Sequence, residues 1–188
     1  MNTVRVVGLD TETTGLSPDK GDRLIEIAMI TVDFTIDGEG VKAKAVDKWS
    51  QRVNPHRSIN PRAQEVHGIS LADLASSPDF LDVAPDVVKR LEAADYMVAH
   101  NADFDVDFIV SELVRVAVPV PKTQVFCTME QGRWATANGK LPSLMELCFA
   151  VGVEYDVSKA HAAEYDVLVM LASLKRGLER GFYNFEEC

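Results

Sequence analysis

The first half of the chain holds three apolar segments that predict strands, over residues 4–12, 24–34 and 45–53. The first is rich in β-branched residues and ends in Thr-Thr-Gly, which is typical of a turn. Residues 37–40, Asp-Gly-Glu-Gly, predict a hairpin turn between the second and third strands. Three strands joined by short connections indicate an antiparallel meander.

Helices and short strands alternate in the middle of the chain. A proline in the first turn and Gly68 after the last predict a short helix that ends near His67. An amphipathic pattern predicts a longer helix over residues 79–92. The elements expected here are helices over about 60–67, 71–74 (capped by Ser70), 79–92 and 104–116, with strands over 96–99 and 124–127.

The last third of the chain is predicted to be helical, over residues 128–135, 141–151 and 162–180. Strands first, then alternation, then helices favour a mixed α/β sheet with helices packed on its faces. With 188 residues, the chain is expected to form one domain over 1–180. Residues 181–188 are expected to be a short, partly ordered tail.

The composition is that of an ordinary globular protein, with 47% hydrophobic and 26% charged residues. No apolar run approaches the ~20 residues that a membrane span requires, and no export signal precedes Asp10. These features predict a cytoplasmic protein without membrane contact. Cys127, Cys148 and Cys188 are widely spaced and include no Cys-x-x-Cys pair, which argues against a disulfide framework and a zinc site.

The net charge of −10 argues against an ordinary nucleic-acid binder, because 29 acidic residues face only 19 basic ones. Such proteins usually carry a basic face that neutralises phosphates. Charge alone would favour a small-molecule enzyme or a protein-interaction domain. A cluster of carboxylates that holds metal ions can still recruit phosphate through those ions.

Asp10 and Glu12 are the first candidate site. They end a predicted strand, and the strand period of two puts both carboxylates on one face. Because like charges repel and acids are depleted in strands, a positive group is expected between them, and hard divalent cations prefer oxygen ligands. The alternative is that both acids begin a solvated turn.

A second acidic group follows the strand over 96–99, where α/β proteins tend to place their sites. Asp103, Asp105 and Asp107 cannot share one helical face, since residues two apart diverge by about 200°. An aspartate in a first turn also caps a helix and complements its dipole.

The third candidate pair is His161 and Asp166. Asp166 lies in an otherwise apolar stretch, which places it near the packed face of a helix. On one helix the two side chains would point ~140° apart, so they converge only if His161 lies on the loop before that helix. Beside a half-buried aspartate, His161 becomes a candidate general base.

Taken together, the sequence resembles the DEDDh 3′→5′ exonucleases, the superfamily of the proofreading epsilon subunit of bacterial DNA polymerase III and of ribonuclease T. The matching motifs, in the family's order, are Asp10-Thr-Glu12-Thr-Thr-Gly15, Val66-His67-Gly68-Ile69, His100-Asn-Ala-Asp-Phe-Asp105 and His161-x-x-x-x-Asp166. The resemblance implies a ribonuclease-H-like fold with a central five-stranded mixed sheet, an antiparallel meander followed by parallel strands.

The resemblance also implies the catalytic roles. Asp10, Glu12, Asp105 and Asp166 would hold two Mg²⁺ or Mn²⁺ ions, and His161 would be the general base. Two metals ~3.5–4 Å apart can stabilise both the attacking and the leaving oxygen of a phosphodiester. Asp105 aligns with the final aspartate of its motif, so Asp103 is expected to act as a helix cap.

Residues near the first motif and in the Val-His-Gly segment would grip the terminal nucleotide of single-stranded or frayed 3′ ends of DNA or RNA. Apolar packing on bases tolerates any sequence. The alternative for Leu16 and Phe104 is that they are ordinary core residues. The implied substrate contacts are Thr13 and Thr14 to the 3′ end, Leu16 and Phe104 to the bases, His67 to the sugar, and Asn101.

Several functions remain open on this basis. Proofreading or degradation of DNA, which we favour, competes with 3′ trimming of RNA, because the contact to the 2′-hydroxyl is not readable. The end of the chain soon after its last predicted helix favours a free-standing enzyme, while a polymerase and a second copy of the chain stay open as partners. A catalytically silent binding module is disfavoured because all five catalytic positions are filled, and a small-molecule phosphohydrolase because no nucleophile motif is present.

Overall fold

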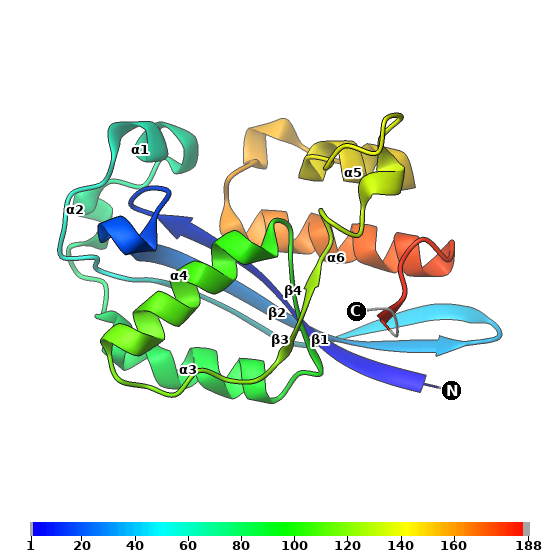
Figure 1. Ribbon diagram of the computed structural model, residues 1–188, viewed down its shortest axis with the longest axis horizontal. Coiled ribbons are helices and arrows are strands. Elements are labelled where there is room, and N and C mark those ends of the chain that lie inside the picture. The colour runs from blue at the N-terminus through cyan, green and yellow to red at the C-terminus, as the bar shows by residue number, and fades with distance from the viewer. Residues whose placement is uncertain (1, 186–188) are drawn as a thin grey trace.

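The computed structural model describes residues 2–185 and contains one five-stranded mixed sheet of order β3-β2-β1-β4-β5 (Figure 1). The antiparallel part is followed by parallel strands, as predicted from the sequence. The antiparallel strands are β1 (Asn2–Thr13), β2 (Leu24–Asp37) and β3 (Gly40–Arg52), and β1 pairs in parallel with β4 (Tyr96–Ala99), which pairs in parallel with β5 (Gln124–Cys127).

Helices cover both faces of this sheet (Figure 1). The alternation of side chains along β1 feeds two separate cores. These helices are α3 Phe80–Glu92, α4 Ala102–Arg115, α5 Leu144–Val151 and α6 Ala163–Glu179. Val4 and Val6 pack with residues of α5 and α6, whereas Val7 and Leu9 pack with residues of α3 and α4.

A glycine in β1 sets the distance between the sheet and α6. A Cβ atom on Gly8 would lie 2.8 Å from the side chain of Leu171 on α6, so a larger residue would push the helix away. Asp166 lies on the same helix, before Leu171, and Asp10 follows Gly8 on the same face of β1. This close approach therefore brings Asp166 over the acidic end of β1.

Two short helices, α1 (Pro61–His67) and α2 (Leu71–Leu74), lie beyond the end of β1 (Figure 1). The side chain of Asn60 caps α1, and Gly68 ends it in the left-handed conformation, with φ +73°. Ser70 forms a reciprocal capping box with Asp73 at α2. The predicted starts and ends of both helices are confirmed.

The helix predicted over residues 128–135 is wrong, because the structure has turns there and a short 3₁₀ helix over Arg133–Ala135. Thr128 is fully buried and bonded to the Ala99 carbonyl, and a Cβ on Gly132 would lie 2.4 Å from the Thr128 carbonyl oxygen. These tight contacts hold the chain in a compact turn. The next helix begins at Leu144 instead of residue 141, because Ser143 caps it with Glu146.

Residues 181–185, expected to belong to a partly ordered tail, pack against the sheet. Tyr183 and Phe185 are buried and contact the ring of Phe126 on β5. The Tyr96 hydroxyl donates a hydrogen bond of 2.6 Å to the Phe185 carbonyl. Residues 186–188, including Cys188, lie outside the described residues. Within residues 2–185, no helix combines the length and apolar character needed to cross a membrane.

Candidate active site

The carboxyl end of β1 carries Asp10 and Glu12 on the face that α6 covers. Burial, followed by repulsion from neighbouring carboxylates, raises the pKa of Glu12 to about 8. The same causes raise the pKa of Asp10 well above its ordinary value, with Asp105, Glu12 and Asp166 among the repelling groups. These side chains therefore form one cluster, in which burial and mutual repulsion favour the protonated carboxyl groups.

Asp105 enters this cluster from the first turn of α4. Its side chain is 3% exposed, and burial raises its pKa to about 7. The Thr11 hydroxyl donates a 2.7 Å hydrogen bond to Asp105 Oδ1, which opposes that rise. Thr11 lies between Asp10 and Glu12 and points to the opposite face of β1, so the motif reaches both sides of the strand.

Asp166 and His161 meet at the start of α6. His161 lies on the loop before the helix, as their convergence requires, and is exposed. Its backbone N–H donates to Asp166 Oδ2 at 3.0 Å, and its φ of +63° is unusual for a residue other than glycine. The other oxygen, Asp166 Oδ1, is buried and has no hydrogen-bond partner among the described residues.

The chemistry of this cluster fits divalent cations. Within residues 2–185, none of the four carboxylates forms an ion pair with a lysine or arginine, and the unpartnered Asp166 Oδ1 is a free oxygen donor. As the side chains stand, no three acidic, histidine or cysteine groups of the described chain surround one metal position. Thr11 bonds one oxygen of Asp105 and His161 one oxygen of Asp166, so each of these carboxylates keeps a second oxygen that could accept an ion.

A cleft of about 380 Å³ opens beside the cluster. Glu12 lines it at the acidic end, together with four of the residues expected to touch the substrate, Thr13, Leu16, His67 and Phe104. Leu16 is 84% exposed, so the alternative that it is a core residue is wrong. Phe104 is half-buried, with its ring 4.9 Å from that of Phe108.

His67 faces this cleft as a neutral side chain. Its Nδ1 accepts a 3.0 Å hydrogen bond from the Ile69 N–H, and burial lowers its pKa. His67 Nε2 is buried without a partner in hydrogen-bonding geometry among the described residues, although the Thr13 carbonyl is near enough to raise its pKa. This nitrogen is therefore a candidate for a polar contact with a ligand in the cleft.

The two threonines of the first motif are occupied by the protein itself. Thr14 is fully buried, its N–H bonds the Arg23 carbonyl, its carbonyl accepts from the Asn60 N–H, and its hydroxyl bonds Asp22 and the Arg23 N–H. Its polar groups are thus all bonded within the protein, and its expected contact with a 3′ end stays a prediction. Thr13 lines the cleft, but its hydroxyl donates to the Gly15 carbonyl at 2.6 Å.

The segment after β4 places its polar residues differently from the expectation. Asn101, not Asp103, is the N-cap residue of α4, so the helix-cap role given to Asp103 is wrong; Asp103 is an exposed residue of the first turn. Asn101 is exposed, with φ +82°. His100 is structural: it bonds Thr128 Oγ1 and the Pro142 carbonyl, and burial lowers its pKa to about 4.

The sequence interpretation missed three groups at this site. Thr11 was overlooked although it lies inside the first motif. Glu26 pairs in register with Glu12 across β1 and β2, and is held by Arg52 of β3 at 2.9 Å. Arg62 lines the cleft. Only the register of the strands could have revealed Glu26, because it belongs to an apolar run.

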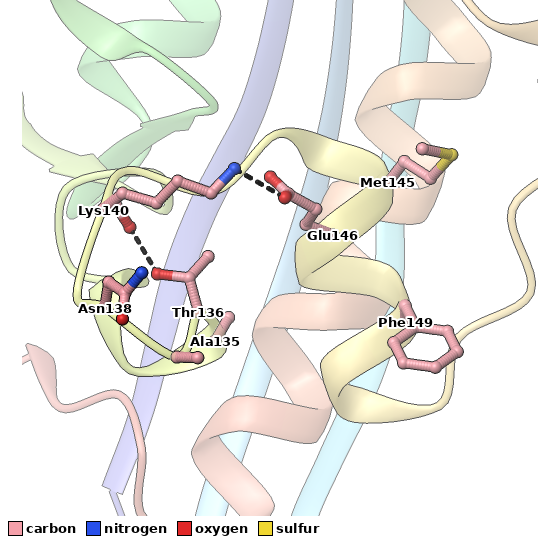
Figure 2. Close-up of a pocket in the computed structure, with 8 residues that line it drawn as sticks. Ala135, Thr136, Asn138, Lys140, Met145, Glu146 and Phe149 are labelled. Atoms are coloured by element: carbon pink, nitrogen blue, oxygen red, sulfur yellow. Dashed lines mark hydrogen bonds and ion pairs between the residues drawn. The ribbon is translucent and has the colours of Figure 1, made fainter.

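A larger hollow of about 560 Å³ lies elsewhere, between α5 and the loop over residues 135–140 (Figure 2). Its polar lining includes a Lys140–Glu146 ion pair of 2.7 Å, a hydrogen bond from the Thr136 hydroxyl to the Lys140 carbonyl, and Asn138. Its charged groups are thus already paired, and none of the expected site residues lines it. The smaller cleft is therefore the better candidate for chemistry.

Comparisons with known sequences and structures show the family of this chain. The family model of the RNase T exonucleases matches residues 7–174. The 3′-5′ exonuclease DinG of Bacillus subtilis (strain 168) is 32% identical over 169 residues, 90% of this chain and 17% of DinG. DNA polymerase III PolC-type of the same organism is 33% identical over 96% of this chain and 12% of that protein. The chain thus spans less than a fifth of the length of either relative.

A third relative, the DNA polymerase III subunit epsilon of Escherichia coli (strain K12), is 29% identical over 88% of this chain and 68% of its own length. Among solved structures, Exonuclease X in complex with 5′-overhanging duplex DNA has a TM-score of 0.66 and 26% identity, and covers 96% of this chain and 95% of that one. The complex of E. coli Exonuclease I with single-stranded DNA has a TM-score of 0.76 at 20% identity, over 95% and 41%. These exonucleases share the ribonuclease-H-like fold. The chain belongs to the RNase T family of exonucleases.

Proposed function

We propose that this protein is a two-metal-ion 3′→5′ exonuclease that removes 5′-mononucleotides from the 3′ ends of single-stranded nucleic acid, with DNA preferred. One observation carries the proposal. The cluster of uncompensated carboxylates opens, through Glu12, into a cleft that presents the exposed Leu16 and the half-buried Phe104. That arrangement joins a cation site to an apolar platform for a base.

Asp10, Glu12, Asp105 and Asp166 are the residues that would hold the metal ions. Exonucleases of this family generally depend on divalent metals. When bound, two Mg²⁺ or Mn²⁺ ions would activate water and stabilise the charge that develops on the phosphodiester oxygens. Four carboxylates also balance the charge of two divalent cations, which explains why the protein tolerates their mutual repulsion.

His161 acts as the general base in this proposal. It is exposed on a loop, so water can reach its ring, and the bond from its backbone to Asp166 Oδ2 fixes the loop beside the carboxylates. A neutral imidazole can accept a proton from the attacking water near pH 7. The role of Asp166 is thus double: it offers oxygen to a cation and holds the segment that carries the base.

The cleft would hold the terminal nucleotide. Leu16 and Phe104 offer apolar surfaces on which a base of any identity can pack, and the unpartnered His67 Nε2 can bond the sugar. Thr13 and Asn101 stay proposed contacts. The DNA preference is supported by two relatives, the PolC-type DNA polymerase III and the epsilon subunit of DNA polymerase III, and by the DNA bound to Exonuclease X. Those relatives also make a polymerase the protein partner to test.

The test uses 5′-labelled single-stranded DNA and RNA of equal sequence, each with Mg²⁺ and with chelator. A metal-dependent ladder of products shortened from the 3′ end, stronger for DNA, is the expected result. His161→Ala should remove the ladder. His56→Ala is the matched control, because His56 is also exposed but bonds Asp79 away from the cleft, and it should leave the ladder intact.

Other outcomes would redirect the assignment. A ladder from RNA alone would make the protein a 3′-trimming exoribonuclease. Release of the 5′ label as a mononucleotide without a ladder would reject the direction, and a ladder that survives chelation would reject the metals. No cleavage of either strand by folded, metal-loaded protein would indicate a silent nucleic-acid-binding module of the same fold.

A further inference from the structure

Arg62 differs from the other arginines of the described chain. Within residues 2–185, nine of the ten arginines form an ion pair or a side-chain hydrogen bond, and Arg62 forms neither. The paired arginines and their partners are Arg5 with Asp33, Arg23 with Glu112, Arg52 with Glu26, Arg57 with Asp22, Arg90 with Asp47, Arg115 with Glu112, Arg133 with the Gly139 carbonyl, Arg176 with Glu179 and Arg180 with the Ala150 carbonyl. Among residues 2–185 of this acidic chain, one guanidinium is thus unpaired.

This unpaired guanidinium lies in the cleft. Arg62 is exposed and lines the same cleft as Glu12, Leu16 and Phe104. It occupies the first turn of α1, which Asn60 caps and Pro61 starts. The capped backbone fixes where the side chain begins, while the guanidinium itself stays free to meet a ligand.

The charge balance of the protein indicates what that ligand is. With 29 acidic residues available, a purely structural arginine would be expected to pair, and of the other nine, seven pair with a carboxylate and two with a backbone carbonyl. A guanidinium is suited to planar, bidentate recognition of phosphate. We propose that Arg62 is a substrate-positioning residue that binds a phosphate of the nucleic-acid strand held in the cleft. This inference rests on the proposed function.

The proposal gives the acidic protein a contact to the substrate that does not pass through metal ions. The carboxylate cluster repels a phosphodiester until cations are bound, whereas Arg62 attracts it at all times. Arg62 would therefore contribute mainly to binding, so its loss should raise KM and leave kcat nearly unchanged.

Arg62→Gln, Arg62→Lys and Arg62→Glu test this role in the full chain with a single-stranded DNA oligomer and Mg²⁺. We expect KM to rise about tenfold for Arg62→Gln, as for the loss of one charge-assisted contact, and kcat to change by less than about twofold. Arg62→Lys should raise KM less than Arg62→Gln does, and Arg62→Glu should raise it more. Lys89→Gln is the control, because Lys89 is exposed and without an ion pair in the described chain but lies on α3 outside the cleft.

Salt dependence gives a readout that a structural role would not move. Each phosphate contact to a single strand adds about 0.7 to the slope of log kcat/KM against log salt, so Arg62→Gln should lower that slope by about 0.7 and Lys89→Gln should not. An unchanged slope would overturn the proposal. So would a loss that depends on the base of the oligomer, which would mean that Arg62 contacts a base edge instead.

The two proposals can fail separately. If wild-type protein cleaves nothing, the proposed exonuclease is rejected, and the same salt comparison is made on the Kd of the uncleaved oligomer. If it cleaves and the slope for Arg62→Gln equals that of wild type, the exonuclease stands and the role of Arg62 is rejected. If wild-type protein neither cleaves nor binds, both are rejected.

Discussion

Helix α4 buries two carboxylates, of which one is paired with arginines and the other is not. Asp105 and Glu112 are seven residues apart, two turns, so both side chains face the sheet, and they are 3% and 0% exposed. Glu112 is held by Arg23 at 2.6 Å, by Arg115 at 3.0 Å and by the Leu24 N–H at 3.2 Å. Asp105 receives one hydroxyl hydrogen bond, from Thr11, and no cation among the described residues.

The difference separates a structural acid from a functional one. A buried carboxylate must be paired or must become neutral. Glu112 is paired within the fold and in turn raises the pKa of the Arg23 guanidinium. Asp105 stays uncompensated, with a raised pKa, beside other acids in the same state. The missing positive charge is therefore expected to come from outside the chain.

Removing the uncompensated acid should have the largest effect on activity. We expect Asp105→Asn to lower the rate of 3′-end hydrolysis by about 10³-fold or more, because an amide carries no charge for a metal ion. Its Tm without metal should equal or exceed that of wild type, since a repelling group is lost. The control is Asp103→Asn, two residues earlier and exposed, which should keep full activity. Full activity of Asp105→Asn would reject the metal-ligand role.

Removing the compensated acid should lower stability and leave activity nearly unchanged. Glu112→Gln should lower the free energy of unfolding by about 3 kcal/mol, because it leaves the guanidinium of Arg23 without its partner. The rate per folded molecule should stay within about twofold of wild type. Glu179→Gln, at a surface pair with Lys175, is the matched control and should cost less than about 1 kcal/mol in a denaturant titration. Equal costs for the two variants would remove the distinction.

The pH dependence of stability should show the uncompensated cluster in wild-type protein. The folded-state pKa is raised to about 8 for Glu12 and to about 7 for Asp105, so the folded, metal-free protein binds more protons than the unfolded chain. The free energy of unfolding should therefore be highest near pH 4 and fall up to about pH 8, by at least about 1.4 kcal/mol, the value of one pKa unit.

Divalent metal should reverse this trend. Mg²⁺ or Mn²⁺ binds the deprotonated carboxylates, so it should raise Tm more at pH 8 than at pH 5. The Asp105→Asn variant should show a smaller metal effect at pH 8. Thermal melts of chelated and metal-loaded protein measure both quantities. A metal-free stability that rises from pH 5 to pH 8 would contradict the raised pKa values.

The sequence alone predicted the role of only one of the two acids of α4. Asp105 was identified because it follows a buried strand within a recognisable motif. Glu112 was not, since its partner Arg23 lies 89 residues away and only the folded chain brings them together. Local patterns thus gave the fold class, most helix ends and the acids of the cluster, because each depends on neighbours in the chain.

Where the sequence-based predictions differ from the structure, the cause is again a contact that forms only in the folded chain. The chain over residues 128–135 has helical propensity, but the buried Thr128 and the packed Gly132 override it. Thr14 lies in the first motif, yet contacts from Asp22, Arg23 and Asn60 consume its polar groups. Such contacts are decided by tertiary packing, which a motif does not encode.

Thr11 offers the smallest and most specific test of how the fold orients its functional acid. Thr11→Val keeps the shape of the buried side chain but removes the hydrogen bond to Asp105 Oδ1. The hydrogen bond contributes about 1 kcal/mol to holding Asp105 in place, and its loss should lower kcat about fivefold. The bond also lowers the pKa of Asp105, so the rise of activity with pH should move to higher pH. Thr11→Ser keeps the hydroxyl and should behave as wild type, whereas equal kinetics for Thr11→Val would show that α4 alone orients Asp105.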